Sequence, residues 1–161
     1  MTRAEIHQRF VARFGGSRAS APFTQADLGC VEAHFRIRLP ASYCEFVTTH
    51  GAVRCNAQLL DLIVDQDSNL WDIAEFLPAA QVISNTTLYV RGGMSDKLVG
   101  FASDSMGNLF GFERSTLAEK REDGPVWFFD HEFCKEELLE KSFDSWLSKY
   151  LTLKGETVHE A

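Results

Sequence analysis

The sequence predicts one α+β domain in which helices pack on one face of an antiparallel sheet. Helical patterns occupy residues 3–51, strand patterns joined by short turns follow, and one helical pattern closes the chain. Short turns favour antiparallel pairing, because parallel strands need long crossover connections. A length of 161 residues fits a single domain over 1–161, with a core at about 24–152 and a polar tail over 154–161 that we expect to fray.

The first predicted helix covers residues 3–14. Ile6, Phe10 and Phe14 recur there every four residues and form one apolar stripe. A Gly-Gly pair that begins at Gly15 ends the pattern, because glycine is a poor helix former.

Two more helices follow. Thr24 and Asp27 form a capping box that starts the second helix, with aspartate in the third helical position. The third helix begins at Pro40, since a proline in the first turn loses no hydrogen bond, and ends at Gly51. The predicted buried residues are Leu28, Val31 and Phe35 in the second helix and Tyr43, Phe46 and Val47 in the third.

Four strand patterns come next. Residues 58–64 form an apolar run that we interpret as a strand. Residues 97–103 and 109–113 are joined by the turn residues 104–108 and predict a hairpin. Residues 125–130 are too apolar for a strand that faces water on both sides.

The remaining segments are one ambiguous stretch and one clear helix. Residues 75–88 fit neither pattern well, although Pro78 would suit the start of a short helix. Ser142 is the predicted N-cap of a last helix over 142–151. Its spacing predicts one buried stripe of Phe143, Trp146, Leu147 and Tyr150.

Charge and hydropathy exclude several function classes. With 16 Lys and Arg against 23 Asp and Glu, the formal net charge is −7, which repels phosphate backbones, so we expect no nucleic-acid partner. No run approaches the roughly 20 apolar residues that a membrane span needs, so we expect no membrane partner. The first residues lack the apolar region of a secretory signal, which indicates a cytoplasmic protein. Oligomeric state is left open between a monomer and a weak homodimer.

The cysteines predict no metal centre and no disulfide. Cys30, Cys44, Cys55 and Cys134 form no C-x-x-C pair and match no zinc module. In a cytoplasmic protein we expect them to be reduced thiols.

Acidic residues concentrate in the middle of the chain. Residues 55–113 carry two Lys or Arg and eight Asp or Glu, whereas residues 1–54 carry seven and four. Such a segment is typical either of a solvated loop face or of a docking surface for a basic protein. Trp71 lies within it, either as a core anchor or as the aromatic centre of an interface. The predicted partner-binding residues are Asp61, Asp65, Asp67, Trp71, Asp72 and Glu75, with Asp104, Glu113 and Asp130 as neighbours.

Reactive side chains at strand ends allow a chemical alternative. Asp104, Asp130 and His131 have the groups to bind a divalent metal or to act as acid and base. Aspartates in these positions also bond to the backbone of turns, and we favour that interpretation. Ser105 lacks the glycines of a nucleophile elbow. We therefore expect no catalytic residue, metal or cofactor, and a small metal-dependent hydrolase is the least favoured function.

Four segments together resemble one known family. Residues 38–46 are similar to an "LP-x-x-Y-x-x-F" helix, and 101–110 to a hairpin with the turn pattern "Asp-x-x-Gly-Asn". Residues 125–131 are similar to an apolar "PV-aromatic" strand that ends in Asp-His, and 142–147 to an "SF-x-x-aromatic" helix. In this order the four segments resemble the SUKH superfamily of Smi/Knr-like proteins. His50 and Ala52 depart from the family's usual Asn and second Gly.

The resemblance implies a fold and a function. It implies an antiparallel sheet of about six strands with helices around it. Most bacterial members resemble immunity proteins of polymorphic toxin systems, contact-dependent or type VI, and bind a cognate toxin, often a nuclease. Eukaryotic relatives are signalling or cell-wall-regulation scaffolds. We therefore expect a non-catalytic immunity protein that occludes the active site of a basic toxin, with a protein-binding adaptor of the same fold as the alternative.

Overall fold

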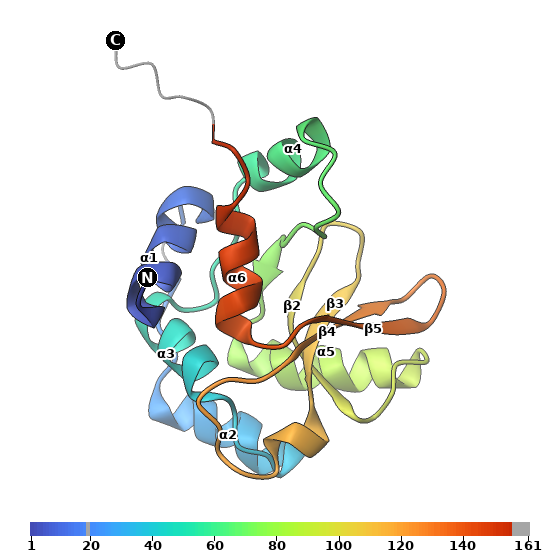
Figure 1. Ribbon diagram of the computed structural model, residues 1–161. Coiled ribbons are helices and arrows are strands. Elements are labelled where there is room, and N and C mark those ends of the chain that lie inside the picture. Colours follow the sequence, from blue (N-terminus) through green and yellow to red (C-terminus); the bar gives the residue numbers. More distant parts are fainter. Residues whose placement is uncertain (19, 156–161) are drawn as a thin grey trace.

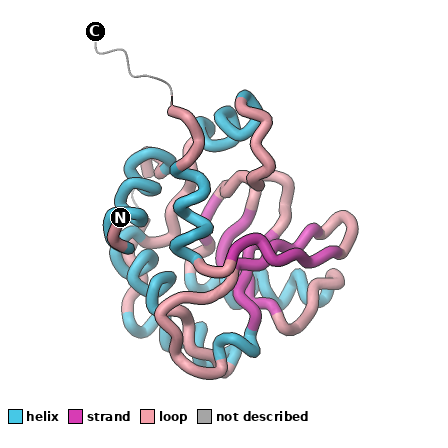
Figure 2. Tube along the Cα trace, viewed as in Figure 1, coloured by secondary structure: helices cyan, strands magenta, loops and turns pink. Residues whose placement is uncertain are grey.

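The computed structural model describes residues 1–18 and 20–155, and it confirms the predicted α+β class. Helices surround a central antiparallel sheet, with α6 on one side and α5 on the other (Figures 1 and 2). The helices are α1 (Arg3–Phe14), α2 (Gln25–Phe35), α3 (Ala41–His50), α4 (Ala57–Asp65), α5 (Ala79–Arg91) and α6 (Phe143–Leu151), with a 3-10 turn η1 (Arg114–Leu117). The polar tail expected to fray lies outside the described residues from 156 onward.

Five strands form one meander in which every neighbouring pair is antiparallel. They are β1 (Glu75–Phe76), β2 (Leu98–Ser103), β3 (Leu109–Glu113), β4 (Val126–Asp130) and β5 (Lys135–Glu140), and they lie in chain order across the sheet. The expected sheet of about six strands is therefore confirmed in type and is close in number.

The helix starts and ends follow the sequence signals. Thr24 Oγ1 accepts from the backbone N–H of Asp27, and Asp27 accepts from that of Thr24, which completes the predicted capping box. Gly51 ends α3 with a φ of 76°, a left-handed backbone that glycine adopts without strain. Ser142 caps α6 as predicted, with its hydroxyl accepting from the N–H of Ser145.

One predicted strand is wrong. Residues 58–64 belong to helix α4, where Leu59, Leu62 and Ile63 are buried. The three buried residues are spaced three and four apart, as on one face of a helix. This spacing is hard to recognise because Leu60 and Val64, which are also apolar, lie between and beside them. These two other apolar residues of the same helix, Leu60 and Val64, are exposed.

Helices cover both faces of the sheet, which confirms the expected arrangement of helices around it, whereas the narrower expectation of helices on one face is wrong. On one face, the rings of Phe110 in β3 and Trp146 in α6 have centroids 4.9 Å apart. On the other face, α5 lies against β2, and Thr86 Oγ1 accepts from the N–H of Gly100 at 2.9 Å. The core is rich in aromatic rings, with Phe101 and Phe112 stacked at 4.4 Å.

Candidate protein-binding surface

Helix α4 presents its acidic residues to solvent. Because Leu59, Leu62 and Ile63 face the core, Asp61 and Asp65 lie on the exposed side. Asp65 occupies the last turn, where the helix dipole disfavours a negative charge. Helix stability therefore does not explain an aspartate at this position.

The turn after α4 extends the acidic surface. Asp67 is exposed and has a left-handed backbone with a φ of 49°, a conformation that aspartate and asparagine tolerate better than most residues. Next to these carboxylates, Val64 is 67% exposed and adds an apolar side chain to the same helix. Exposed apolar groups beside charges are typical of protein interfaces.

Trp71 serves both as an anchor and as a surface residue. Its ring stacks on that of Phe128 in β4, with centroids 4.4 Å apart and planes at 13°. Its carbonyl accepts from the hydroxyl of Tyr150 at 2.6 Å. The ring nevertheless remains 38% exposed, and its indole Nε1 donates to Glu137 Oε1 at 3.4 Å. Such a fixed, half-exposed tryptophan loses little side-chain entropy when a partner covers it.

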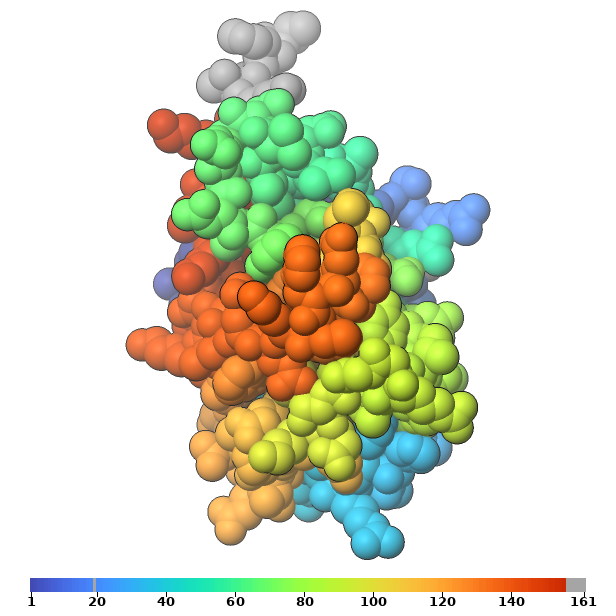
Figure 3. All heavy atoms as spheres, turned by 90° about the vertical axis from the view of Figure 1, so that its right-hand side faces the viewer, coloured from blue at the N-terminus to red at the C-terminus, as the bar shows by residue number. Residues whose placement is uncertain are grey.

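A groove of about 440 Å³ borders Trp71. It lies between the loop after α4, strand β5 and helix α6, and its lining includes Leu70, Glu137, Leu138, Lys149 and Tyr150. Figure 3 shows the green α4 segment and loop above the orange β4–β5 hairpin on one face of the molecule. The loop, the strand and the helix thus form the walls of one depression.

The β4–β5 hairpin contributes carboxylates that the sequence analysis did not include. Residues 130–140 contain five acidic residues and one lysine, a net charge of −5 + 1 = −4. The acidic residues are Asp130, Glu132, Glu136, Glu137 and Glu140. Three of them, Glu136, Glu137 and Glu140, lie in the six residues KEELLE of β5. This density of charge was the available signal, but the segment lacks the alternation that identifies a strand.

Two predicted surface residues lie inside the protein. Asp72 is 8% exposed and accepts from the hydroxyl of Ser105 at 3.0 Å. Burial raises its pKa more than the bonds from Ser105 lower it. Asp104 is 4% exposed, and its carboxylate accepts from the N–H groups of Met106 and Asn108. Both carboxylates hold the β2–β3 turn and are not available to a partner.

The other predicted neighbours lie in different places. Glu75 forms an ion pair with Arg54, at 3.3 Å between Nε and Oε2. Asp130 accepts from the N–H groups of Glu132 and Phe133 and shapes the hairpin turn. Glu113 pairs with Leu98, at the opposite end of β2 and β3 from the 104–108 turn. Asp61, Asp65 and Asp67 are thus exposed on α4 and on the turn after it, within the segment that leads to Trp71, whereas Glu113 lies at the far end of β3.

The strand-end residues that allowed a chemical alternative form a hydrogen-bonded turn. His131 donates its backbone N–H to Asn108 Oδ1 at 3.0 Å, and its ring Nδ1 lies 2.7 Å from the same oxygen. Gly107 has a φ of 85°, as expected for this turn. Within residues 1–18 and 20–155, no group of three His, Cys, Asp or Glu side chains is placed to hold a metal ion. In the same residues, no helix has the length and apolar character needed to cross a membrane.

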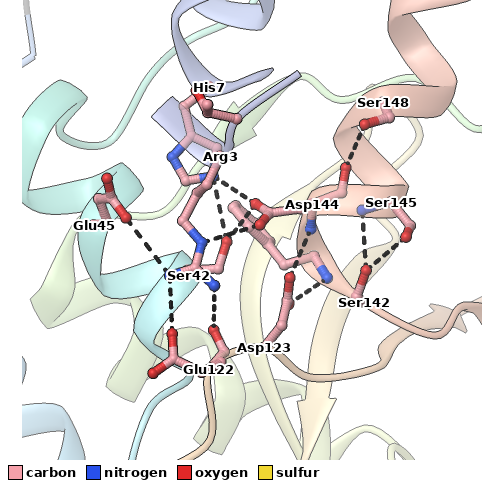
Figure 4. Close-up of polar contacts among 12 residues, drawn as sticks. Arg3, His7, Ser42, Glu45, Glu122, Asp123, Ser142, Asp144, Ser145 and Ser148 are labelled. Carbon is pink, nitrogen blue, oxygen red and sulfur yellow. Dashed lines mark hydrogen bonds and ion pairs between the residues drawn. The ribbon is translucent and has the colours of Figure 1, made fainter. Parts of the chain in front are cut away.

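A second polar cluster joins α1, α3 and α6 (Figure 4). His7 Nε2 lies 2.7 Å from Asp144 Oδ1, and Arg3 Nε donates to Asp144 Oδ2 at 3.1 Å. Ser42 also donates its hydroxyl to Asp144 Oδ1. Burial raises the pKa of Asp144, but the hydrogen bonds from His7, Ser42 and Arg3 have the larger, opposite effect, and the resulting pKa is about 2.

The serine, histidine and aspartate of this cluster do not have the geometry of a catalytic triad. Ser42 donates its hydroxyl to Asp144, and both Ser42 and Asp144 face the same ring nitrogen, Nε2 of His7. In a catalytic triad the serine and the aspartate bond to different ring nitrogens. Ser42 is also 0% exposed, so no substrate can reach its oxygen. The cluster holds three helices together.

A comparison with protein families decides the family. The model of the SMI1 / KNR4 family (SUKH-1) matches residues 22–149, which is more than half of the chain. The chain belongs to the SMI1/KNR4 family. No curated protein matches it.

Family membership agrees with the places of the four quoted segments. Residues 38–46 lead into α3, 101–110 form the β2–β3 hairpin, 125–131 contain β4, and 142–147 begin α6. All four lie within the matched range. The matched range also contains α4 and β5, which carry the exposed carboxylates described above.

Proposed function

We propose that this SMI1/KNR4 protein is a non-catalytic immunity-type protein that binds a basic toxin and neutralises it by covering its active site. The observation that carries the proposal is the half-exposed Trp71, which lies beside a groove and donates to the exposed carboxylate of Glu137. Family membership is consistent with this class of protein. We define the acidic face as Asp61, Asp65, Asp67, Trp71, Glu136 and Glu137.

Charge and shape have separate tasks in this mechanism. A toxin that acts on an anionic substrate such as RNA or DNA has a cationic cleft, and a negative surface accelerates its capture. Electrostatic steering can raise association to roughly 10⁸ M⁻¹s⁻¹ at low salt. Exposed charge pairs add little to equilibrium affinity, about 0–1 kcal/mol each. Tight binding therefore depends on the burial of Trp71 and its apolar neighbours.

Protection of cells against the toxin tests the proposal. The toxin is sought as the product of the gene next to the gene for this chain, and the two proteins are co-expressed. Growth in the presence of the chain, and death in its absence, is the expected result. A neighbouring product that is not toxic, but that binds this chain, would instead support an adaptor function.

Matched variants then test the surface. Asp61→Lys and Asp65→Lys are combined with Asp67→Asn, because asparagine tolerates the left-handed backbone at this position. The control combines Glu113→Lys and Glu119→Lys, which change residues at the end of β3 and after η1, at the opposite end of β2 and β3 from the 104–108 turn. We expect the first variant to protect less and the control to protect like the parent. Equal protection by both variants would exclude this surface.

A further inference from the structure

We propose that the open edge of β5 receives an extended, cationic segment of the partner as an additional antiparallel or parallel strand. This inference rests on the proposed function and specifies how the partner is held. It assigns a role to β5, which the proposed mechanism uses only for its charge.

The edge is open in the described structure. β5 is the last strand of the order β1-β2-β3-β4-β5, and among residues 1–18 and 20–155 its backbone pairs only with β4. Residues 135–138 are exposed, and the hairpin that carries them projects from the body of the molecule (Figure 1). An edge strand presents a row of free N–H and C=O groups, to which an extended segment can add.

Carboxylates are held on both faces of this edge. Glu136 lies opposite Phe129 and accepts from the backbone N–H of Ser95 at 2.7 Å. Glu137 lies opposite Phe128 and accepts from Trp71. Because successive residues of a strand point to opposite faces, the two carboxylates flank the edge above and below. Basic side chains on both faces of an added strand would therefore meet an opposite charge.

The groove provides room on one of these faces. It is bordered by Glu137, Leu138 and Leu139 of β5 and by Trp71. A side chain of the added strand that points to the Trp71 face enters this groove, where an apolar or long basic residue would cover the exposed part of the indole ring. Main-chain bonds would supply affinity, and the groove and the carboxylates would supply specificity.

Charge disfavours a second copy of this chain as the occupant in the pairings centred on residues 136 to 138. In a two-fold antiparallel pairing of two β5 strands, residues directly opposite each other point to the same face. A pairing centred on Glu136 or on Glu137 places that glutamate opposite its own copy. A pairing centred on Leu138 places Glu136 opposite Glu140. Like charges directly opposite each other are destabilising, so the edge favours a cationic segment over itself.

Hydrogen exchange of the full chain tests the inference with a defined probe. The probe is a short capped peptide of alternating lysine and valine at millimolar concentration, and the control is the matching peptide of glutamate and valine. We expect the lysine peptide to slow exchange of the outward-facing β5 amides by about tenfold and the glutamate peptide to leave them unchanged. Absence of slowing, or equal slowing by both peptides, would overturn the inference.

Two proline variants separate main-chain pairing from charge. Adjacent residues of a strand direct their N–H groups to opposite sides, so of Glu136→Pro and Glu137→Pro only one removes a bond to β4. The variant that keeps the parent's thermal stability has lost an outward N–H. We expect it to bind the lysine peptide about tenfold more weakly than the glutamine variant of the same position, which also lacks the carboxylate but keeps the N–H. Undiminished binding by this variant would contradict strand addition.

A charge variant keeps the inference testable if both proline variants disrupt β5. Glu136→Gln with Glu137→Gln keeps the side-chain shape and the open edge, and we expect it to lose the preference for lysine over glutamate peptide. A preference that survives would place the cationic segment elsewhere. Failure to protect against any toxin would refute the proposed function alone, whereas protection without slowed β5 amides would refute only the strand addition.

Discussion

Asp65 illustrates how a single residue reveals a conflict between stability and binding. It lies in the last turn of α4, which contains no basic residue, so its carboxylate meets the negative end of the helix dipole. Natural sequences tolerate such a local conflict chiefly where function requires it. In the proposed complex, the same carboxylate faces the basic partner.

The variant Asp65→Lys should therefore increase stability while it weakens binding. Removal of an unfavourable charge and addition of a favourable one at a helix C-terminus is worth about 0.5–1 kcal/mol. Urea denaturation measures the change, and Asp61→Lys, in the middle of the helix, serves as the control with a smaller expected effect. A loss of stability in Asp65→Lys would show that the carboxylate has a structural partner.

Asp144 makes a prediction about acid stability. Its pKa is lowered from the ordinary value of 3.8 to about 2 by the bonds from His7, Ser42 and Arg3, which together exceed the opposing effect of burial. A carboxyl whose folded pKa is below its unfolded pKa stabilises the protein above the unfolded value and loses that contribution as the pH falls toward the folded value. Between about pH 4 and pH 2, the parent should therefore lose stability through this group.

The comparison with Asp144→Asn isolates that contribution. The variant should be less stable than the parent near neutral pH by about 1–3 kcal/mol, because three donors lose a charged acceptor. The difference between the two proteins should then shrink as the pH falls through this window. Burial raises the pKa of the neighbouring Asp123, and the charge of Asp144 contributes to that rise. Asp144→Asn therefore also relieves part of the unfavourable effect at Asp123, which makes the stability difference smaller. A difference that is constant with pH would mean that Asp144 has the same pKa in the folded and the unfolded protein.

At the scale of elements, the β2–β3 turn shows what local sequence can predict. Asp104, Gly107 and Asn108 predict a turn from their residue types alone, and the structure has the expected backbone bonds and the positive φ at Gly107. A β-carbon at Gly107 would also lie 3.4 Å from His131 Cε1. Glycine is therefore favoured at this position chiefly because of the positive φ, since a β-carbon would make only ordinary contact with His131.

Two substitutions at this turn separate backbone strain from contact. Gly107→Ala should destabilise the protein by about 1 kcal/mol, because alanine disfavours a φ of 85°. Gly107→Asn should be closer to the parent, since asparagine adopts positive φ more readily. Thermal denaturation measures both. Asparagine that is more disruptive than alanine would show that crowding by His131 dominates.

The elements that sequence reasoning missed share a physical cause. In α4 only Gln58 and Asp61 interrupt the apolar residues before Asp65, and a short, mostly apolar run is compatible with a buried strand as well as with a short helix. β5 has no alternation because it is an exposed edge strand, whose pairing with β4 is a tertiary event. By contrast, α1, α2, α3 and α6 were predicted, because capping residues and one apolar stripe are local signals.

The candidate surface was only partly accessible to sequence for the same reason. The exposed carboxylates Asp61, Asp65 and Asp67 belong to the segment singled out by its charge. Asp72 is buried where it accepts from Ser105, a residue distant in the chain, and no local pattern specifies that contact. Asp104 instead accepts from Met106 and Asn108 within its own turn, as its residue type allows. The contribution of Glu137 depends on its contact with Trp71 across the groove, which no local pattern specifies.

For the whole molecule, the net charge of −7 predicts how binding should respond to salt. If charge steers the encounter and Trp71 holds the complex, then ionic strength and mutation should act on different rate constants. Screening lengths fall from about 30 Å at 0.01 M salt to about 8 Å at 0.15 M, so steering by exposed carboxylates should weaken across this range.

Stopped-flow kinetics with the toxin should show this separation. The association rate of the parent should fall by about tenfold or more between these salt concentrations, and the variant with Asp61→Lys, Asp65→Lys and Asp67→Asn should show a smaller fall from a lower starting value. Trp71→Ala should keep the parent's association rate and salt dependence but dissociate about tenfold or more faster, because it removes the buried aromatic centre. If the carboxylate variant changed only dissociation, or if Trp71→Ala changed only association, the assignment of steering to charge and of affinity to the tryptophan would be reversed, and the complex would have to be held chiefly by its ion pairs.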